Sequence, residues 1–143
     1  MEELTQIVNL LEKIETNNLN DDPETKKWIN DLTDPEFGFV TSCSELLIEN
    51  IQNAKVSREI ILVLRKMLFY NPDNVLPQME KSKDFVNGIL KYLTNIKAED
   101  STQEIFILLN AISFNSKNTF HLNLPEEIVL NEQFNQSLIS YLG

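Results

Sequence analysis

Two short stretches of this chain are repeated about 45 residues further on, and this spacing limits the folds that the chain can adopt. Residues 58–64 (REIILVL) correspond to residues 103–109 (QEIFILL), and residues 85–93 (FVNGILKYL) correspond to residues 134–142 (FNQSLISYL). Repetition at such a period is typical of stacked helical repeats, in which each unit buries its apolar face against its neighbours. We therefore expect an all-α protein built from similar helical units.

Apolar residues recur at steps of three and four along most of the chain, and the chain has only three glycines. This pattern predicts helices separated by polar or proline-containing breaks. The expected helices carry residues 4–14, 23–32, 39–51, 60–70, 75–81, 85–93, 105–114, 122–130 and 134–142. Residues 34–36 (Asp-Pro-Glu) read as the start signal of the third helix, and Ser57 opens the fourth.

The apolar run from residue 60 to residue 70 is nearly continuous, which indicates a helix buried on most of its sides. The second long apolar helix, residues 105–114, should pack beside it. We expect the centre of the core to contain Leu62, Leu64, Leu68, Ile105, Leu108, Leu109 and Ile112.

The length and the charge of the chain narrow its partners. A chain of 143 residues fits one domain, residues 1–143. The net charge of −10 argues against binding to phosphate backbones or anionic lipid, so we expect protein partners and no nucleic acid. No apolar stretch approaches the ~20 residues of a membrane span, so we expect no membrane insertion. The N-terminus does not resemble a secretory signal, and Cys43 is the only cysteine, so we expect a cytoplasmic or nuclear protein.

Three segments align as the recurring end of a long helix followed by an Asn-containing turn: residues 10–20 (LLEKIETNNLN), 64–74 (LRKMLFYNPDN) and 108–118 (LLNAISFNSKN). Each is followed by a short helix and then by a helix that begins with an aromatic residue. This order, and the text of residues 64–74 and 109–115 above all, resembles the armadillo repeat. The resemblance implies a right-handed stack of about two and a half repeats.

The chain departs from the armadillo pattern at two points. Armadillo repeats usually place a glycine between the short and the medium helix, where this chain has residues 82–84 (SKD) and 131–133 (NEQ), so a HEAT-like unit is an alternative. The chain also ends on a medium helix, which suggests a fragment of a longer array, a partner or a second copy. We expect one of these to cover a C-terminal face made by Phe134, Leu138, Ile139 and Leu142.

No constellation of residues points to catalysis, a metal or a cofactor. A nucleophilic site would require Cys43 to meet His121, the only histidine, with no third group suggested by spacing. Residues 20–24 (NDDPE) are acidic, but they lack the alternating ligands and central glycine of a calcium loop. We therefore expect structural packing for Cys43, no metal and no cofactor.

The armadillo resemblance implies a peptide-binding groove along the long helices. The position that holds an asparagine in each armadillo repeat falls on Glu12, Lys66 and Asn110, and the aromatic position one turn earlier falls on Val8, Leu62 and Phe106. We expect a protein partner to dock around Leu62, Lys66, Phe106 and Asn110. A solvated or interdomain face is the alternative for Lys66 and Glu12.

These patterns favour a non-catalytic protein-interaction module, a scaffold or adaptor. The first alternative is an armadillo-like regulator of a GTPase, of the exchange-factor or formin type, and the second is an enzyme. Binding of a GTPase would favour the first alternative, and turnover abolished by changing Cys43 or His121 would favour the second.

Overall fold

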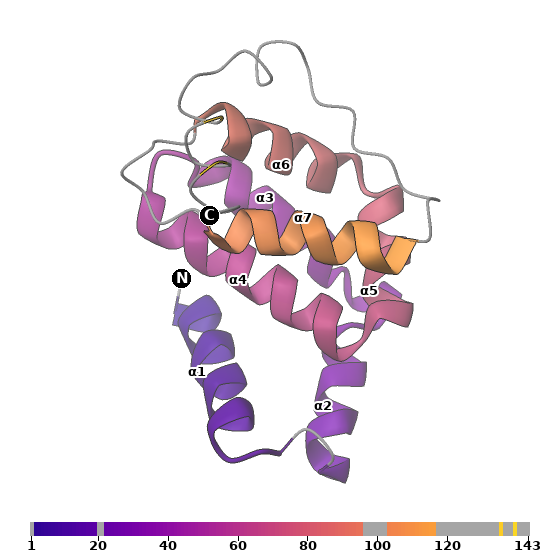
Figure 1. Cartoon of the computed structure of the whole chain (residues 1–143). Helices are drawn as coiled ribbons and strands as arrows, with labels where there is room; N and C mark the ends of the chain where they lie inside the picture. The colour runs from indigo at the N-terminus through magenta and orange to yellow at the C-terminus, as the bar shows by residue number, and fades with distance from the viewer. Residues whose placement is uncertain (1, 20–21, 96–102, 117–134, 136–138, 140–143) are drawn as a thin grey trace.

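The structure, a computed structural model, describes residues 2–19, 22–95, 103–116, 135 and 139, and every regular element among them is helical (Figure 1). This confirms the all-α prediction for the described residues. The elements in chain order are α1 (Glu2–Thr16), α2 (Pro23–Leu32), the short 3-10 helix η1 (Pro35–Phe37), α3 (Phe39–Glu49), α4 (Ala54–Tyr70), α5 (Pro72–Lys81), α6 (Lys83–Thr94) and α7 (Gln103–Ser116).

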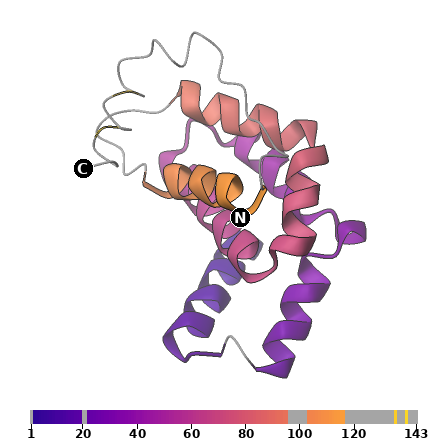
Figure 2. The same cartoon turned by 45° about the vertical axis from the view of Figure 1, so that its right-hand side comes forward.

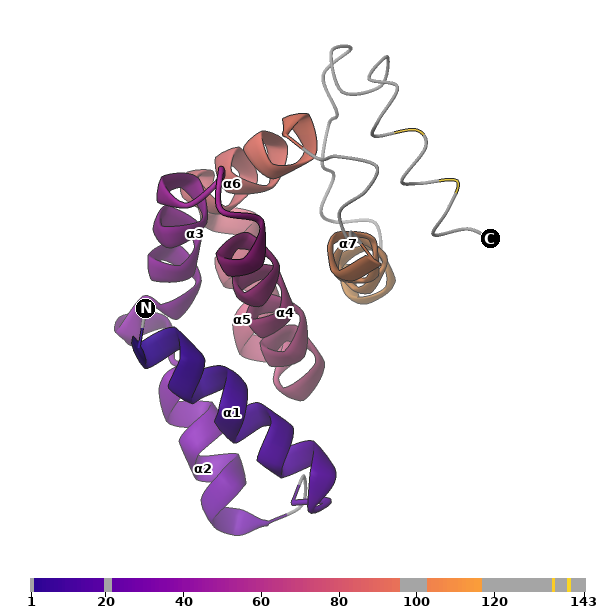
Figure 3. The same cartoon turned by 90° about the vertical axis from the view of Figure 1, so that its left-hand side faces the viewer.

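Helices from distant parts of the chain pack against each other. α4 packs against α1 and α7, and α3 packs against α6 (Figure 1). α5 follows α4 directly and contacts α3, α4 and α7. In Figure 2 and Figure 3, as in Figure 1, α1 and α2 extend away from the remaining helices at one end of the molecule. The centre of the arrangement is therefore α4.

Side-chain caps fix where several helices begin. The Thr25 amide donates to Asp22 Oδ2 over 3.1 Å at the start of α2, and Pro23 occupies the first turn, where its missing N–H costs nothing. The Val56 amide donates to Asn53 Oδ1 over 3.2 Å, so α4 begins three residues before the expected Ser57.

The start of α3 differs from the expectation. Asp34 caps only the short helix η1, because its carboxylate accepts from the Glu36 amide over 2.9 Å and the chain then turns at Gly38. Gly38 has φ of +72°, a left-handed conformation that glycine adopts without a steric penalty. α3 therefore begins at Phe39, and it ends at Glu49, before Ile51.

The buried core agrees with most of the expected residues. Between residues 60 and 70, seven of the eleven side chains are buried, as expected for a helix covered on most sides. Five of the expected central residues are also buried: Leu64, Leu68, Ile105, Leu108 and Ile112. Leu62 and Leu109 are only half-buried, so the centre of the core contains fewer of the expected residues than the sequence suggested.

α3 and α6 approach each other closely at Gly88. A Cβ atom added there would lie 3.3 Å from Leu47 Cδ2 and 3.5 Å from the Ser44 carbonyl oxygen. Ser44 itself is fully buried, and its hydroxyl donates to the Val40 carbonyl over 2.7 Å. Small residues on both helices thus allow the two backbones to come together.

Truncation of Leu64, which is fully buried, should lower the free energy of unfolding by about 2–5 kcal/mol, because Leu64→Ala leaves a cavity in a packed core. Leu10 is 43% exposed, so Leu10→Ala is the matched control, with an expected change below about 1 kcal/mol. Urea unfolding followed by circular dichroism measures both changes. Equal losses for the two variants would contradict the core described above.

Candidate partner-binding surface

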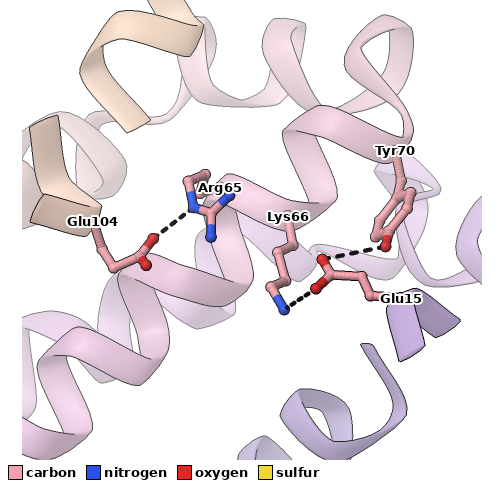
Figure 4. Close-up of polar contacts among 5 residues, drawn as sticks. All are labelled: Glu15, Arg65, Lys66, Tyr70 and Glu104. Carbon is pink, nitrogen blue, oxygen red and sulfur yellow. Dashed lines mark hydrogen bonds and ion pairs between the residues drawn. The ribbon is translucent and has the colours of Figure 1, made fainter. Parts of the chain in front are cut away.

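Two ion pairs join α4 to its neighbours on opposite sides (Figure 4). Arg65 Nε donates to Glu104 Oε2 of α7, and Lys66 Nζ donates to Glu15 Oε2 of α1 over 3.1 Å. Consecutive residues of a helix are about 100° apart around its axis, so Arg65 reaches α7 while Lys66 reaches α1. The surface of α4 between these two side chains therefore faces the space between α1 and α7.

Lys66 is the most buried charged side chain in the described part of the chain, with 6% of the residue exposed. A buried ammonium group is costly unless it is paired, and the Glu15 carboxylate supplies that partner. The Glu15 side chain is 49% exposed, so water screens the pair from one side. The contact orients α1 on α4 more than it stabilises the fold.

Glu15 also accepts a hydrogen bond from Tyr70, whose hydroxyl lies 3.4 Å from Glu15 Oε1. Burial raises the pKa of Tyr70, and the charge and hydrogen bond of Glu15 raise it further, because both disfavour the phenolate. Arg65 opposes this and lowers the Tyr70 pKa. The end of α4 thus carries a protonated tyrosine beside a carboxylate.

Phe69 lies on the same side of α4, one turn after Arg65 and Lys66, and 74% of the residue is exposed. Its ring meets the Tyr70 ring edge to face, with the ring centroids 5.5 Å apart and the planes at 73°. Leu62, one turn before Arg65 and Lys66, is half-buried. We call the accessible set Leu62, Arg65, Phe69 and Tyr70 the α4 strip.

The four residues expected at a docking site occupy different environments. Leu62 is half-buried and Asn110 is exposed. Lys66 is buried against Glu15, and Phe106 is 4% exposed and belongs to the core. The structure thus leaves two of the four accessible on α4 and α7, and docking at these residues stays a prediction.

The sequence reasoning missed Phe69. The spacing of Phe69 could have indicated its exposure. Residue 69 follows Leu62 by seven positions and Arg65 by four, which puts all three on one side of α4. The near-continuous apolar run around it hid that signal, because Arg65 and Lys66 are the only charged residues between residues 60 and 70 and define the polar face poorly.

The C-terminal face lies almost wholly outside the described residues. Phe134, Leu138 and Leu142 are among the residues not described, as is His121. Ile139 is helical and 69% exposed. What covers that face stays a prediction.

The other chemistry candidates can be placed in part. Cys43 is buried, and burial raises its pKa to about 12. In the acidic stretch at residues 20–24, the Asp22 carboxylate caps α2, and residues 20 and 21 are outside the described part. The described residues contain no group of three His, Cys, Asp or Glu side chains that could hold a metal ion. In the same part of the chain, no helix combines the length and the apolar character needed to cross a membrane.

The Cys43 thiol should resist an aromatic disulfide reagent at pH 8 in the folded protein and react fully in urea, because burial keeps it protonated. The folded state holds this proton more tightly than the unfolded state, whose thiol has a pKa near 9.0. Stability from this group is therefore complete below pH 9 and is lost as the pH rises toward 12. Rapid labelling of the folded chain would contradict this placement of Cys43.

Glu15→Gln should lower the pKa of Tyr70 toward its ordinary value of 10.0, because the change removes the neighbouring negative charge. The pKa should stay above that value, since burial is the largest cause of the shift. A titration followed by NMR of ring-labelled tyrosine measures the change. Glu12→Gln, at an exposed position of the same helix, is the control and should leave the Tyr70 pKa unaltered.

No protein-family model matches this chain. No curated protein and no solved structure matches it either. Support for a function therefore comes from the contacts, charges and exposure of the side chains described above.

Proposed function

We propose that the protein is a non-catalytic interaction module, a scaffold or adaptor, that binds a partner protein along the α4 strip. The observation that carries this proposal is the exposure of Phe69, at 74%, in the last turn of α4, directly after three buried residues, 66–68. An aromatic side chain left in water beside a tyrosine and an arginine has the composition of a binding hot spot, where a few such residues supply most of the affinity.

The contacts around the strip favour binding without a large rearrangement. Arg65 of the strip is held by Glu104, and the adjacent Lys66 is held by Glu15, so both side chains are ordered before a partner arrives. Side chains that are already ordered lose less conformational entropy on binding. Phe69 and Leu62 then form the apolar part of the contact, and Asn110 on α7 extends it with an amide that can donate and accept.

The order of the helices supports an armadillo-like or HEAT-like stack of about two and a half repeats. Long, short and medium helices follow one another twice, with lengths of 15, 10 and 11 residues in α1 to α3 and 17, 10 and 12 in α4 to α6. α7 then packs on α4 as the next long helix. Such stacks present extended surfaces for binding proteins. With one cysteine, a reducing compartment such as the cytoplasm or nucleus suits the chain.

The test begins with affinity purification of partners from the source cell, followed by calorimetry of each purified partner with variants of the chain. Phe69→Ala should weaken binding by about tenfold or more, the effect of losing a hot-spot aromatic, with no large change in melting temperature. Phe37, 64% exposed on η1, provides the matched control, and Phe37→Ala should bind as the wild type does.

Unchanged affinity of Phe69→Ala for every partner found would contradict the α4 strip as the binding surface. A large fall in melting temperature would show instead that Phe69 contributes to folding. An equal loss of affinity in Phe69→Ala and Phe37→Ala would indicate a general effect of removing apolar surface rather than a specific site.

A further inference from the structure

A second accessible apolar surface lies at the end of the molecule formed by α1 and α2. A hollow of about 320 Å³ lies between the last turns of α1 and the beginning of α2. We call it the N-terminal groove, and the residues that line it are Leu10, Lys13, Ile14, Leu19, Asp22, Glu24, Thr25 and Trp28.

The end of α1 holds one wall of the groove in place. Asn18 adopts a left-handed conformation with φ of +55°, and the Leu19 amide then donates back to the Ile14 carbonyl over 2.9 Å. The Asn18 amide lies 3.4 Å from the Glu15 carbonyl oxygen. This is the Schellman arrangement, in which the apolar residue after the turn packs toward the last turn of the helix. It brings Leu19 to the same wall as Ile14.

The start of α2 holds the opposite wall. The Asp22 amide donates to the Leu19 carbonyl over 3.0 Å, and the Asp22 carboxylate accepts from both the amide and the hydroxyl of Thr25. Trp28 follows Thr25 by three positions and so lies one turn further along the same side of α2. Both walls are thus fixed by hydrogen bonds within the chain.

The apolar side chains of the groove remain in contact with water. Leu10 is 43% exposed and Leu19 is 38% exposed, and the half-buried ring of Trp28 lies in the same groove. Large apolar side chains gathered in one hollow are typical of a binding site, whereas apolar residues scattered singly over a surface are ordinary. The volume is at the lower end of ligand pockets, which suits one or two anchoring side chains of a larger partner.

The charge around the groove indicates which charge a partner should carry. Residues 1–32 contain eight acidic and three basic side chains, which is half of the net charge of −10 in less than a quarter of the chain. Asp22 and Glu24 line the groove, with Lys13 as the one cation among its lining residues. Lys26 instead lines a different hollow with Tyr70 and Asn71. A field of this sign attracts basic partners and repels a second copy of this chain.

We propose that the N-terminal groove binds a basic amphipathic helix of another protein. Apolar side chains of that helix, spaced by three or four residues, would enter between Leu10, Leu19 and Trp28. Its lysines or arginines would lie near Glu24 and Asp22, and one could stack on the Trp28 ring. The inference rests on the protein being an interaction module, but it uses a surface separate from the α4 strip.

Trp28 is the only tryptophan, so its fluorescence reports directly on the groove of the full chain. The probe is a synthetic helical peptide of about 15 residues with leucines on one face and lysines on the other. It should shift the Trp28 emission to shorter wavelength in a saturable titration. Peptides with glutamate for lysine, or serine for leucine, should bind about tenfold more weakly or not at all.

The double variant Leu10→Ser and Leu19→Ser keeps every charge and removes two apolar side chains that are already partly exposed. It should weaken binding of the lysine peptide by about tenfold, whereas the control Phe37→Ser should bind it normally. The melting temperatures of both variants check that the fold persists. Phe69→Ala should also bind the peptide normally, so failure of the α4 strip and failure of the groove give different results.

Three results would overturn the proposal. Equal binding of the lysine peptide to the wild type and to the double variant would show that only general charge attraction is at work. Equal binding of the glutamate peptide would remove the argument from charge. Analytical ultracentrifugation could also show that the wild type is a dimer and the double variant a monomer. That result would make a second copy of this chain the occupant of the groove.

Discussion

The burial of α4 is the constraint on which the rest of the structure depends. α4 contacts α1, α3, α5 and α7, so most of the described chain is arranged around one helix. Its apolar side chains provide the stability, because burial of apolar surface is the dominant favourable term in folding. Apolar packing has little direction of its own, however. The contacts of Arg65 with Glu104 and of Lys66 with Glu15 give the flanking helices a defined register on α4.

The helices among the described residues could be predicted from the sequence because their apolar periodicity and their caps are local signals, whereas the helix expected over residues 122–130, and nearly all of that over 134–142, lie outside the described part. Asp22 with Pro23 marks the start of α2, and the polar stretch after Tyr70 marks the end of α4. Long-range contacts could not be predicted in this way. Lys66 and Glu15 are 51 residues apart in sequence, and no local pattern indicates that they meet.

The candidate site was harder to predict because residues 60–70 of α4 are apolar except for Arg65 and Lys66, and residues 105–109 of α7 are all apolar. The rotation of a helix is inferred from its polar face, and such runs define that face poorly. The armadillo resemblance placed Phe106 on the docking surface, where it is in fact buried, whereas Phe69, which the sequence analysis did not single out, is exposed. The armadillo resemblance implied a surface on α4 and α7, but it could not distinguish which aromatic side chain reaches water.

The two proposed surfaces are connected by a single helix, α1. Ile14 and Glu15 are consecutive residues of α1, yet Ile14 lines the N-terminal groove and Glu15 contacts Lys66 and Tyr70 on α4. The same turn of α1 thus forms a wall of the N-terminal groove and contacts Tyr70 of the α4 strip. Because Glu15 holds α1 to α4 through a half-exposed contact, the apolar residues Leu4 and Leu11, both buried, must carry most of the attachment of α1. A change to a polar side chain of α1 should therefore alter the proposed surfaces more than the attachment of the helix.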